Sequence, residues 1–210
     1  MSGLTFDQAF ARCPLVAILR GLTPMEAPAI GEALVDAGFT LVEVPLNSPS
    51  PLDSIAALAR GLEGRAVVGA GTVLSTQDVS RLADAGGTLC ISPNTNPAVI
   101  SEAASRGMAA LPGYFTPTEA FAALDAGATA LKLFPADGAS PAMLKAHRAV
   151  LPKDTRVLAV GGIDAGNMAC WCDAGADGFG LGSNLYRPGK TAQDVARDAA
   201  AMVATMKDLI

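Results

Sequence analysis

Short apolar runs alternate with longer segments of mixed polarity along the whole chain. The longer segments predict helices over residues 25–37, 51–62, 117–126 and 191–207, with a short helix over 5–12. Alternation of strands with helices is typical of parallel βαβ units. The apolar runs have the length of buried strands, and eight of them are found: "PLVAILR", "TLVEVPL", "AVVGAG", "TLCISP", "MAALPG", "TALKLFP", "RVLAVGG" and "DGFGLGS".

The tripeptide Asp-Ala-Gly occurs four times within this pattern. Its copies begin at Asp36, Asp84, Asp125 and Asp173, at separations of 48, 41 and 48 residues, which leaves room for two β–α units in each interval. Each copy ends a helix-like segment and precedes an apolar run, as expected for a glycine that caps a helix in the left-handed conformation. Eight β–α units predict an α/β protein with a closed (β/α)8 TIM barrel, in a single domain spanning residues 1–210.

A doubly wound open sheet is the alternative arrangement of the same elements. Such sheets often carry G-x-G-x-x-G after the first strand, whereas this chain has "LRGLTPME" there. No linker-like stretch divides the chain. The barrel is therefore the favoured prediction.

The composition and net charge of the chain limit the kinds of molecule that it is expected to bind. Half of the 210 residues are hydrophobic and 17% are charged, which excludes disorder and fits a sheet covered on both faces. A net charge of −5 gives no support for nucleic-acid binding. No apolar run approaches the ~18 residues that span a bilayer, and the N-terminus lacks the layout of a secretory signal. We expect a cytoplasmic protein without nucleic-acid or membrane partners.

The four cysteines do not form a convincing metal site. Cys170 and Cys172 form a C-x-C pair, but the only histidine, His147, lies in a separate helical segment. Reduced thiols are the usual state in a cytoplasmic protein. We predict no metal.

Three charged residues stand near the ends of otherwise apolar strands: Arg20, Glu43 and Lys132. Lys132 alternates with Leu131 and Leu133, so that it faces the opposite side of its strand. In (β/α)8 barrels the carboxyl ends of the strands form the active site, and a consistent model turns all three side chains inward there. The alternatives are a solvated Arg20 and a structural Glu43–Lys132 ion pair.

A lysine in an apolar pocket loses solvation of its charged form, so its pKa falls toward neutrality. The neutral amine attacks carbonyls to give a Schiff base, and a nearby carboxylate can shuttle the protons. Lys132 and Glu43 therefore predict an imine-forming lyase or aldolase that needs no cofactor.

Glycine-rich turns after the last two strands indicate what the substrate carries. The loops after strands seven and eight are the usual phosphate site of these barrels, with backbone N–H groups facing the anion. The candidate phosphate contacts are Gly161, Gly162, Gly182 and Ser183. Thr72, in "GAGTVL", is a candidate carboxylate contact. Other candidate binding residues at strand ends are Asn47, Pro93, Phe134 and Val160.

A set of motifs in a fixed order spans about residues 15–186: "LRGLTP", "LVEVPLNSP", "VGAGTVL", "ISPNTN", "PGYFTPTEA", "ALKLFPA", "AVGGI" and "GLGSNLY". Together these motifs resemble the class I 2-keto-3-deoxy-6-phosphosugar-acid aldolases. The resemblance implies a homotrimer of (β/α)8 barrels that cleaves a phosphorylated sugar acid to pyruvate and glyceraldehyde 3-phosphate. It implies Lys132 as the Schiff-base lysine, Glu43 as the proton shuttle, and Arg20 and Thr72 as contacts at the pyruvate end. It also implies phosphate contacts at Gly161, Gly162, Gly182 and Ser183.

Two positions bear on which sugar is bound. Gluconate-type members of this family typically have arginine in the second strand and threonine before the Gly-Gly pair, where this chain has Asn47 and Val160. Both differences are similar to the 6-phosphogalactonate branch, and predict a preference for the galacto configuration at C4. Gluconate or dual specificity remains an alternative, since exchanging a methyl for a hydroxyl need not give a large ratio.

Other phosphate-binding barrels are competing hypotheses. Epimerases and thiamine-phosphate synthases use His, Asp or Lys patterns that this sequence does not show. A non-catalytic phosphosugar-binding barrel would not need the Lys132–Glu43 pair. The pair therefore favours the aldolase.

Overall fold

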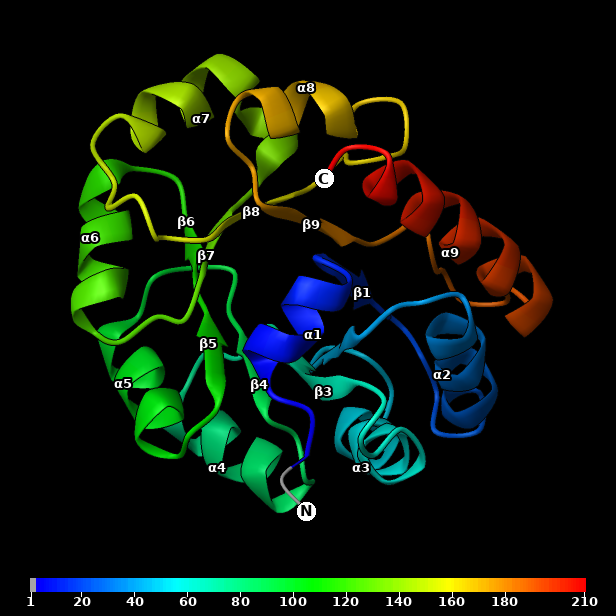
Figure 1. Cartoon of the computed structure of the whole chain (residues 1–210). Helices are drawn as coiled ribbons and strands as arrows, with labels where there is room; N and C mark the ends of the chain where they lie inside the picture. The colour runs from blue at the N-terminus through cyan, green and yellow to red at the C-terminus, as the bar shows by residue number, and fades with distance from the viewer. Residues whose placement is uncertain (1–2) are drawn as a thin grey trace.

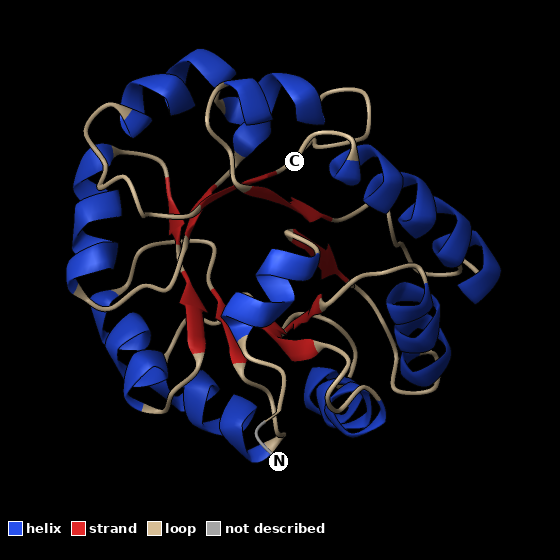
Figure 2. Cartoon of the chain, viewed as in Figure 1, coloured by secondary structure: helices blue, strands red, loops and turns tan. Residues whose placement is uncertain are grey.

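Within residues 3–210, which the computed structural model describes, short parallel strands form a ring at the centre of the molecule (Figure 2). Each strand except β5 is followed by a segment that returns outside the ring. The strands are β1 (Leu15–Ile18), β2 (Leu41–Pro45), β3 (Val67–Gly71), β4 (Leu89–Ile91), β5 (Ala109–Leu111), β6 (Gly113–Tyr114), β7 (Leu131–Leu133), β8 (Val157–Val160) and β9 (Gly178–Leu181).

The ring closes through Pro112. The strand order is β5-β4-β3-β2-β1-β9-β8-β7-β6, so the two ends of the sheet are β5 and β6, which are consecutive in the chain. Proline lacks the N–H that a ladder needs, which divides this strand in two. Its carbonyl still accepts from the backbone N–H of Lys132 at 2.9 Å. Counting β5 and β6 as one strand gives eight. The prediction of a (β/α)8 TIM barrel is confirmed, and the open-sheet alternative is wrong.

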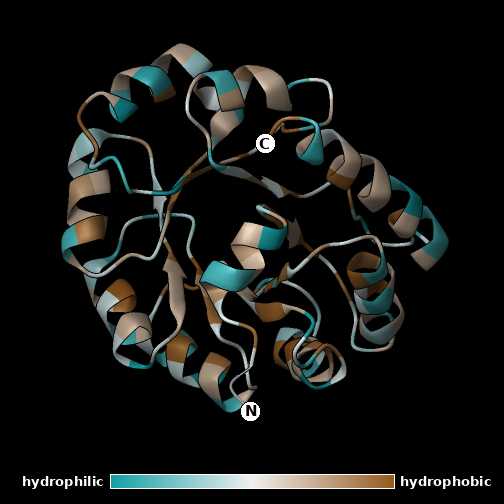
Figure 3. Ribbon diagram, viewed as in Figure 1, coloured by the Kyte–Doolittle hydropathy of each residue, from teal (hydrophilic) through white to brown (hydrophobic). Residues whose placement is uncertain are grey.

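Helices surround the barrel and cover its outer face (Figure 1). Figure 3 shows hydrophobic and hydrophilic residues mixed along them, as expected for helices with one face on a sheet. None of the helices within residues 3–210 has the length and apolar composition that a bilayer span requires. The outer helices are α2 (Ala27–Asp36), α3 (Pro51–Gly61), α4 (Thr76–Asp84), α5 (Pro97–Ser105), α6 (Pro117–Asp125), α7 (Pro141–Arg148), α8 (Met168–Asp173) and α9 (Ala192–Lys207), with a 3-10 turn η1 (Ala136–Gly138) before α7.

The glycines of the four Asp-Ala-Gly repeats all have the left-handed backbone that ends a helix. Their φ angles are +107° at Gly38, +81° at Gly86, +97° at Gly127 and +99° at Gly175. This agrees with the role inferred from the repeat.

The helix starts agree less closely. Helix α2 was predicted from residue 25 but begins only at Ala27, because the Thr23 hydroxyl hydrogen-bonds to the side chain of Glu26 in the preceding turn. Side chains fix other helix starts: Ser140 caps α7, and Ser75 forms a reciprocal capping box with Asp78 at the start of α4. The difference at α2 shifts an element boundary by a few residues and leaves the barrel unchanged.

The first helix, α1 (Phe6–Arg12), lies across the opening formed by the amino ends of the strands (Figure 1). Phe6, Ala9 and Phe10 join the apolar cluster inside the barrel. The Thr40 hydroxyl donates to the carbonyl of Ala9 at 2.7 Å, which ties the helix to β2. The barrel is therefore filled at its floor, and polar groups reach the interior only from the opposite end. Inward strand residues complete the cluster: Val16, Ile18, Leu41, Val67, Leu89, Ile91, Ala109, Leu111, Ala130, Leu158 and Val160.

Truncating the floor of the barrel is expected to destabilise the protein. Phe10→Ala removes a buried ring that packs against Phe6 at a centroid distance of 5.5 Å and leaves a cavity. We expect the free energy of unfolding to fall by about 3 kcal/mol in denaturant titrations with an unchanged m-value. Phe121→Ala on α6, where the ring is 40% exposed, is the matched control and should cost much less. Equal losses in the two variants would contradict a packed floor.

Candidate active site

Lys132 lies on β7 with its side chain inside the barrel. It is only 8% exposed, and its Nζ lies 4.5 Å from the centroid of the Phe134 ring. Alternation along the strand causes this placement, because Leu131 and Leu133 pack outward against the helices while Ala130 belongs to the interior cluster. The ammonium is thus surrounded by apolar and aromatic groups rather than water.

Glu43 enters the same space from β2 and is 2% exposed. Its Oε2 atom is buried and has no hydrogen-bond partner within residues 3–210. The neighbouring strand makes room for it, since a Cβ on Gly71 would stand 1.6 Å from Oε2. Gly71 therefore fixes where the carboxyl group can lie.

Lys132 and Glu43 line one small cavity of about 10 Å³, together with inward aliphatic residues. The salt bridges within the described part of the chain do not include this pair, so no Nζ–carboxylate contact of 4.0 Å or less joins them. The alternative of a structural ion pair is wrong. The amine and the carboxyl group can therefore act separately on one carbonyl compound, with Nζ at the carbonyl carbon and the carboxyl group beside it.

Burial favours the neutral form of both groups. Desolvation lowers the pKa of Lys132, an effect opposed by the charge of Glu43 and reinforced by that of Arg20. Desolvation likewise raises the pKa of Glu43, while the charges of Lys132 and Arg20 oppose the rise. An amine with a lowered pKa is a better nucleophile at neutral pH, and a carboxyl group with a raised pKa is better able to donate a proton.

Arg20 lies at the mouth of the barrel rather than inside it. Its side chain is exposed, and its guanidinium donates to Asn47 Oδ1 at 2.5 Å. Arg20 stands two residues beyond the end of β1, which places its exposed side chain at the mouth, where it lines a cavity with Ile18 and Val160. Asn47 occupies one side of the guanidinium and leaves the rest free to meet an anion.

A second cavity, of about 160 Å³, opens above the first. The two share Ile18, Val160 and Gly180, so a ligand can extend from Lys132 toward the outside past these residues. The predicted residues that line the outer cavity are Arg20, Phe134, Val160, Gly161, Gly162, Gly182 and Ser183.

Backbone conformation explains the glycines of this outer cavity. Gly161 and Gly162 have φ angles of +117° and +66°, which strain any residue with a Cβ. A Cβ on Gly161 would also stand 3.0 Å from the backbone nitrogen of Ala136. Gly182 has nothing within 4 Å of its would-be Cβ. Such a lining exposes backbone, which suits an anion held by N–H groups.

Three predicted residues lie outside both cavities. Thr72 is half-buried and has a φ angle of +59°, a conformation unusual for threonine, directly after Gly71. Asn47 is connected to the site only through Arg20, and Pro93 lies at the end of β4. Their roles stay predictions.

Several site residues were missed by the sequence prediction. Strand alternation could have found Gly71 and Gly180, which occupy inward positions. Ile163 and Asn184 also line the outer cavity, and Asn184 falls within the quoted "GLGSNLY" motif. Within residues 3–210, no group of three or more His, Cys, Asp or Glu side chains is placed to hold a metal ion.

Comparison with known proteins defines the class of this barrel. A family model described as KDPG and KHG aldolase matches residues 6–200, and the chain belongs to this aldolase family. A probable 2-dehydro-3-deoxy-6-phosphogalactonate aldolase of Rhizobium meliloti (strain 1021) is 52% identical over 91% of this chain and 90% of the relative.

Two further comparisons agree with that assignment. The 2-dehydro-3-deoxy-6-phosphogalactonate aldolase of Escherichia coli (strain K12) is 48% identical over 95% of this chain and 97% of its own length. A solved native KDPGal structure superimposes with a TM-score of 0.93 at 48% identity, covering 94% of this chain and 96% of that chain. The resemblance inferred from the sequence motifs is confirmed.

Filling the space beside Glu43 is expected to impair the aldolase. Gly71→Ala places a methyl group where Oε2 lies, so the carboxyl group must rotate away from the inner cavity. We expect kcat to fall about 100-fold, the lower range for loss of a general acid–base. Steady-state kinetics of aldol cleavage measure the change.

A shortened acid provides the rescue. Glu43→Asp withdraws the carboxyl group by one methylene, so the double variant Gly71→Ala/Glu43→Asp should turn over faster than Gly71→Ala alone. Gly61→Ala on α3, where a Cβ meets nothing within 4 Å, controls for the glycine replacement. A double variant no faster than Gly71→Ala would show that the clash with Glu43 is not the cause.

Proposed function

We propose that Lys132 is the Schiff-base lysine of this aldolase and that Glu43 moves its protons. The observation that carries the proposal is the burial of both groups in one cavity without an ion pair between them. The proposed substrate is 2-dehydro-3-deoxy-6-phospho-D-galactonate, and the products are pyruvate and D-glyceraldehyde 3-phosphate. The identity of about 50% to proteins named for that substrate supports the choice.

The first half of the reaction forms an imine. The neutral Nζ of Lys132 attacks the C2 carbonyl and gives a carbinolamine. In its protonated form, which burial favours, Glu43 donates a proton to the departing hydroxyl, which leaves as water. The product is a protonated imine on Lys132, with Glu43 now a carboxylate.

The second half breaks the C3–C4 bond. The Glu43 carboxylate removes the proton of the C4 hydroxyl, the C4–O bond becomes a carbonyl, and the C3–C4 electron pair moves into the imine to give an enamine. Glyceraldehyde 3-phosphate leaves. Glu43 returns the proton to C3 and becomes a carboxylate again. Water then hydrolyses the resulting protonated pyruvate imine to pyruvate and neutral Lys132, and the proton that this step releases returns to Glu43. Atoms and protons balance over the cycle without a cofactor.

Both charged ends of the substrate are proposed to meet residues near the carboxyl ends of the strands. Arg20 at the barrel mouth binds the carboxylate, with Thr72 as a further contact. The phosphate lies against the backbone of Gly161, Gly162 and Gly182 and against Ser183, a proposal supported by their place in one glycine-lined cavity.

Val160 is proposed to select the configuration at C4. It belongs to both cavities, so a chain that runs from Nζ to the phosphate loops passes it near the bond that breaks. Valine offers no hydrogen bond to a C4 hydroxyl, in contrast to the threonine of gluconate-type members. The galacto substrate is therefore preferred, and 2-dehydro-3-deoxy-6-phosphogluconate is the alternative.

A homotrimer is the proposed assembly, on the basis of the family resemblance. Large apolar side chains exposed on the single chain, such as Met25 (92%) and Leu74 (51%), support burial of some surface between copies. Sedimentation equilibrium should give three times the chain mass of 21.2 kDa. A monomer would contradict it.

Borohydride reduction in the presence of pyruvate tests the role of Lys132. The imine is reduced to a stable secondary amine, so mass spectrometry should locate one adduct on the peptide that contains Lys132. Lys132→Ala should give no adduct and no turnover. An unmodified wild-type protein, or an adduct on another lysine, would refute the proposal and favour a non-catalytic phosphosugar-binding barrel.

The ratio of kcat/KM for the galactonate and gluconate substrates tests the selection at C4. The wild type should favour the galactonate, and Val160→Thr should shift the ratio toward the gluconate by about 10-fold, the value of one hydrogen bond to the substrate. Val157→Thr, at the far end of the same strand, serves as the control. An unchanged ratio in Val160→Thr would remove this residue from substrate selection.

A further inference from the structure

The two loops proposed to hold the phosphate are joined by one side chain. Asn184 follows β9, and its Nδ2 donates to the carbonyl of Ile163, which follows β8, at 2.9 Å. A phosphate that accepts N–H groups from both loops requires them at a fixed separation. A hydrogen bond between the loops supplies this constraint directly.

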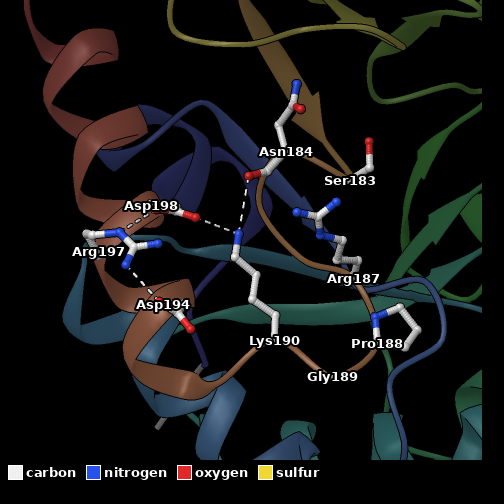
Figure 4. A pocket seen from close by; sticks show the side chains of 9 residues that line it. All are labelled: Ser183, Asn184, Arg187, Pro188, Gly189, Lys190, Asp194, Arg197 and Asp198. Atoms are coloured by element: carbon white, nitrogen blue, oxygen red, sulfur yellow. Dashed lines mark hydrogen bonds and ion pairs between the residues drawn. The ribbon is translucent and has the colours of Figure 1, made fainter.

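The loop after β9 is held in turn by Lys190. Its ammonium donates to the carbonyl of Leu185 at 2.6 Å and to that of Asn184 at 3.4 Å. Figure 4 shows this side chain rising between the Asn184 backbone and α9. Only 12% of this side chain is exposed, so its ammonium is held against the loop and α9 rather than in solvent.

The same ammonium connects the loop to α9. Lys190 Nζ lies 2.6 Å from Asp198 Oδ2, and the other oxygen of Asp198 accepts from Arg197 Nε at 2.9 Å (Figure 4). An ammonium has three N–H donors, and Lys190 uses them on two carbonyls and one carboxylate. It therefore acts on the loop and has no donor left for the phosphate itself.

The contacts form a continuous path from the helix to the anion cavity. Asp198 fixes Lys190, Lys190 fixes the carbonyl of Asn184, and the side chain of Asn184 fixes the loop after β8. The hollow that Figure 4 shows, of about 460 Å³, shares Ser183 and Asn184 with the outer cavity. The path therefore runs along the outer side of the same backbone whose inner side lines the proposed phosphate site.

We infer that Lys190 and Asn184 are positioning residues for phosphate binding, which hold the two glycine-rich loops at the separation a phosphate group needs. This inference rests on the proposed function. It predicts that losing either residue weakens recognition of the phosphate and leaves the chemistry at Lys132 intact, since neither residue lines the inner cavity.

Aldol addition with saturating pyruvate and two acceptor aldehydes separates these effects. In Lys190→Met, KM for glyceraldehyde 3-phosphate should rise about 10-fold, the value of one or two hydrogen bonds to a charged group. The kcat/KM for unphosphorylated glyceraldehyde and the rate of borohydride trapping with pyruvate should stay within about twofold, the scatter between independent measurements of such constants. Inorganic phosphate should inhibit this variant less strongly than the wild type.

Two further variants and a control guard against a general loss of structure. Asn184→Ala leaves the Lys190–Asp198 contact in place and should show the same selective rise in KM. Lys190→Arg keeps a cation that can bind Asp198 and should recover part of the affinity. Lys145→Met replaces an exposed lysine on α7 and should change nothing.

The outcomes distinguish this inference from the proposed function. A wild-type protein that fails to trap pyruvate would overturn the proposed function. Trapping by the wild type, with wild-type KM for glyceraldehyde 3-phosphate in both Lys190→Met and Asn184→Ala, would overturn the positioning role alone. Equal losses with the two aldehydes would also overturn it, because a merely structural role does not select for phosphate.

Discussion

The barrel holds a lysine and a glutamate in its interior without pairing them, and this constraint governs the rest of the site. Burial of either charge without a partner is costly, so burial lowers the pKa of Lys132 and raises that of Glu43, which favours the neutral form of each group. Two interactions partly offset the cost of burying these charges. The Lys132 amine lies over the face of the Phe134 ring, and the charged forms of Lys132 and Glu43 attract each other across the cavity. The instability of the charged forms is also what makes the groups reactive.

The surrounding architecture follows from this need for a dry interior. Helix α1 closes the floor with Phe6 and Phe10, so solvent reaches the amine only from the carboxyl ends of the strands. Near that end, inward positions of β3 and β9 carry glycine rather than aliphatic side chains. Gly71 leaves space for the carboxyl group, and a Cβ on Gly180 would stand 2.8 Å from Val160. Apolar side chains fill the barrel near α1, whereas the glycines near the carboxyl ends of β3 and β9 leave a cavity.

Regular elements were predictable from the sequence, whereas loop contacts were not. Strand alternation placed Lys132 and Glu43 inside because successive residues face opposite sides, and the Asp-Ala-Gly repeat gave the number of units. Arg20 lies beyond the end of β1, where alternation no longer applies, and it is exposed. Lys190 lies in a loop with no periodicity, so its burial against α9 depends on tertiary contacts that local patterns do not encode. Strand alternation places Gly71 at an inward position, but the space it leaves for the Glu43 carboxyl group depends on a side chain from the adjacent strand, which the local pattern does not show.

The outer cavity is lined by glycine backbone rather than by further cationic side chains, which is consistent with a buried, unpaired amine at Lys132. A lysine or arginine placed there would add a positive charge near Lys132, and the charge of Arg20 already lowers the pKa of that amine. Glycine-lined loops offer N–H dipoles without a formal charge. Lys190, whose ammonium contacts the loop after β9, is compensated by Asp198 on α9. The Lys190–Asp198 pair therefore supports the loop after β9 without lining the inner cavity beside Lys132.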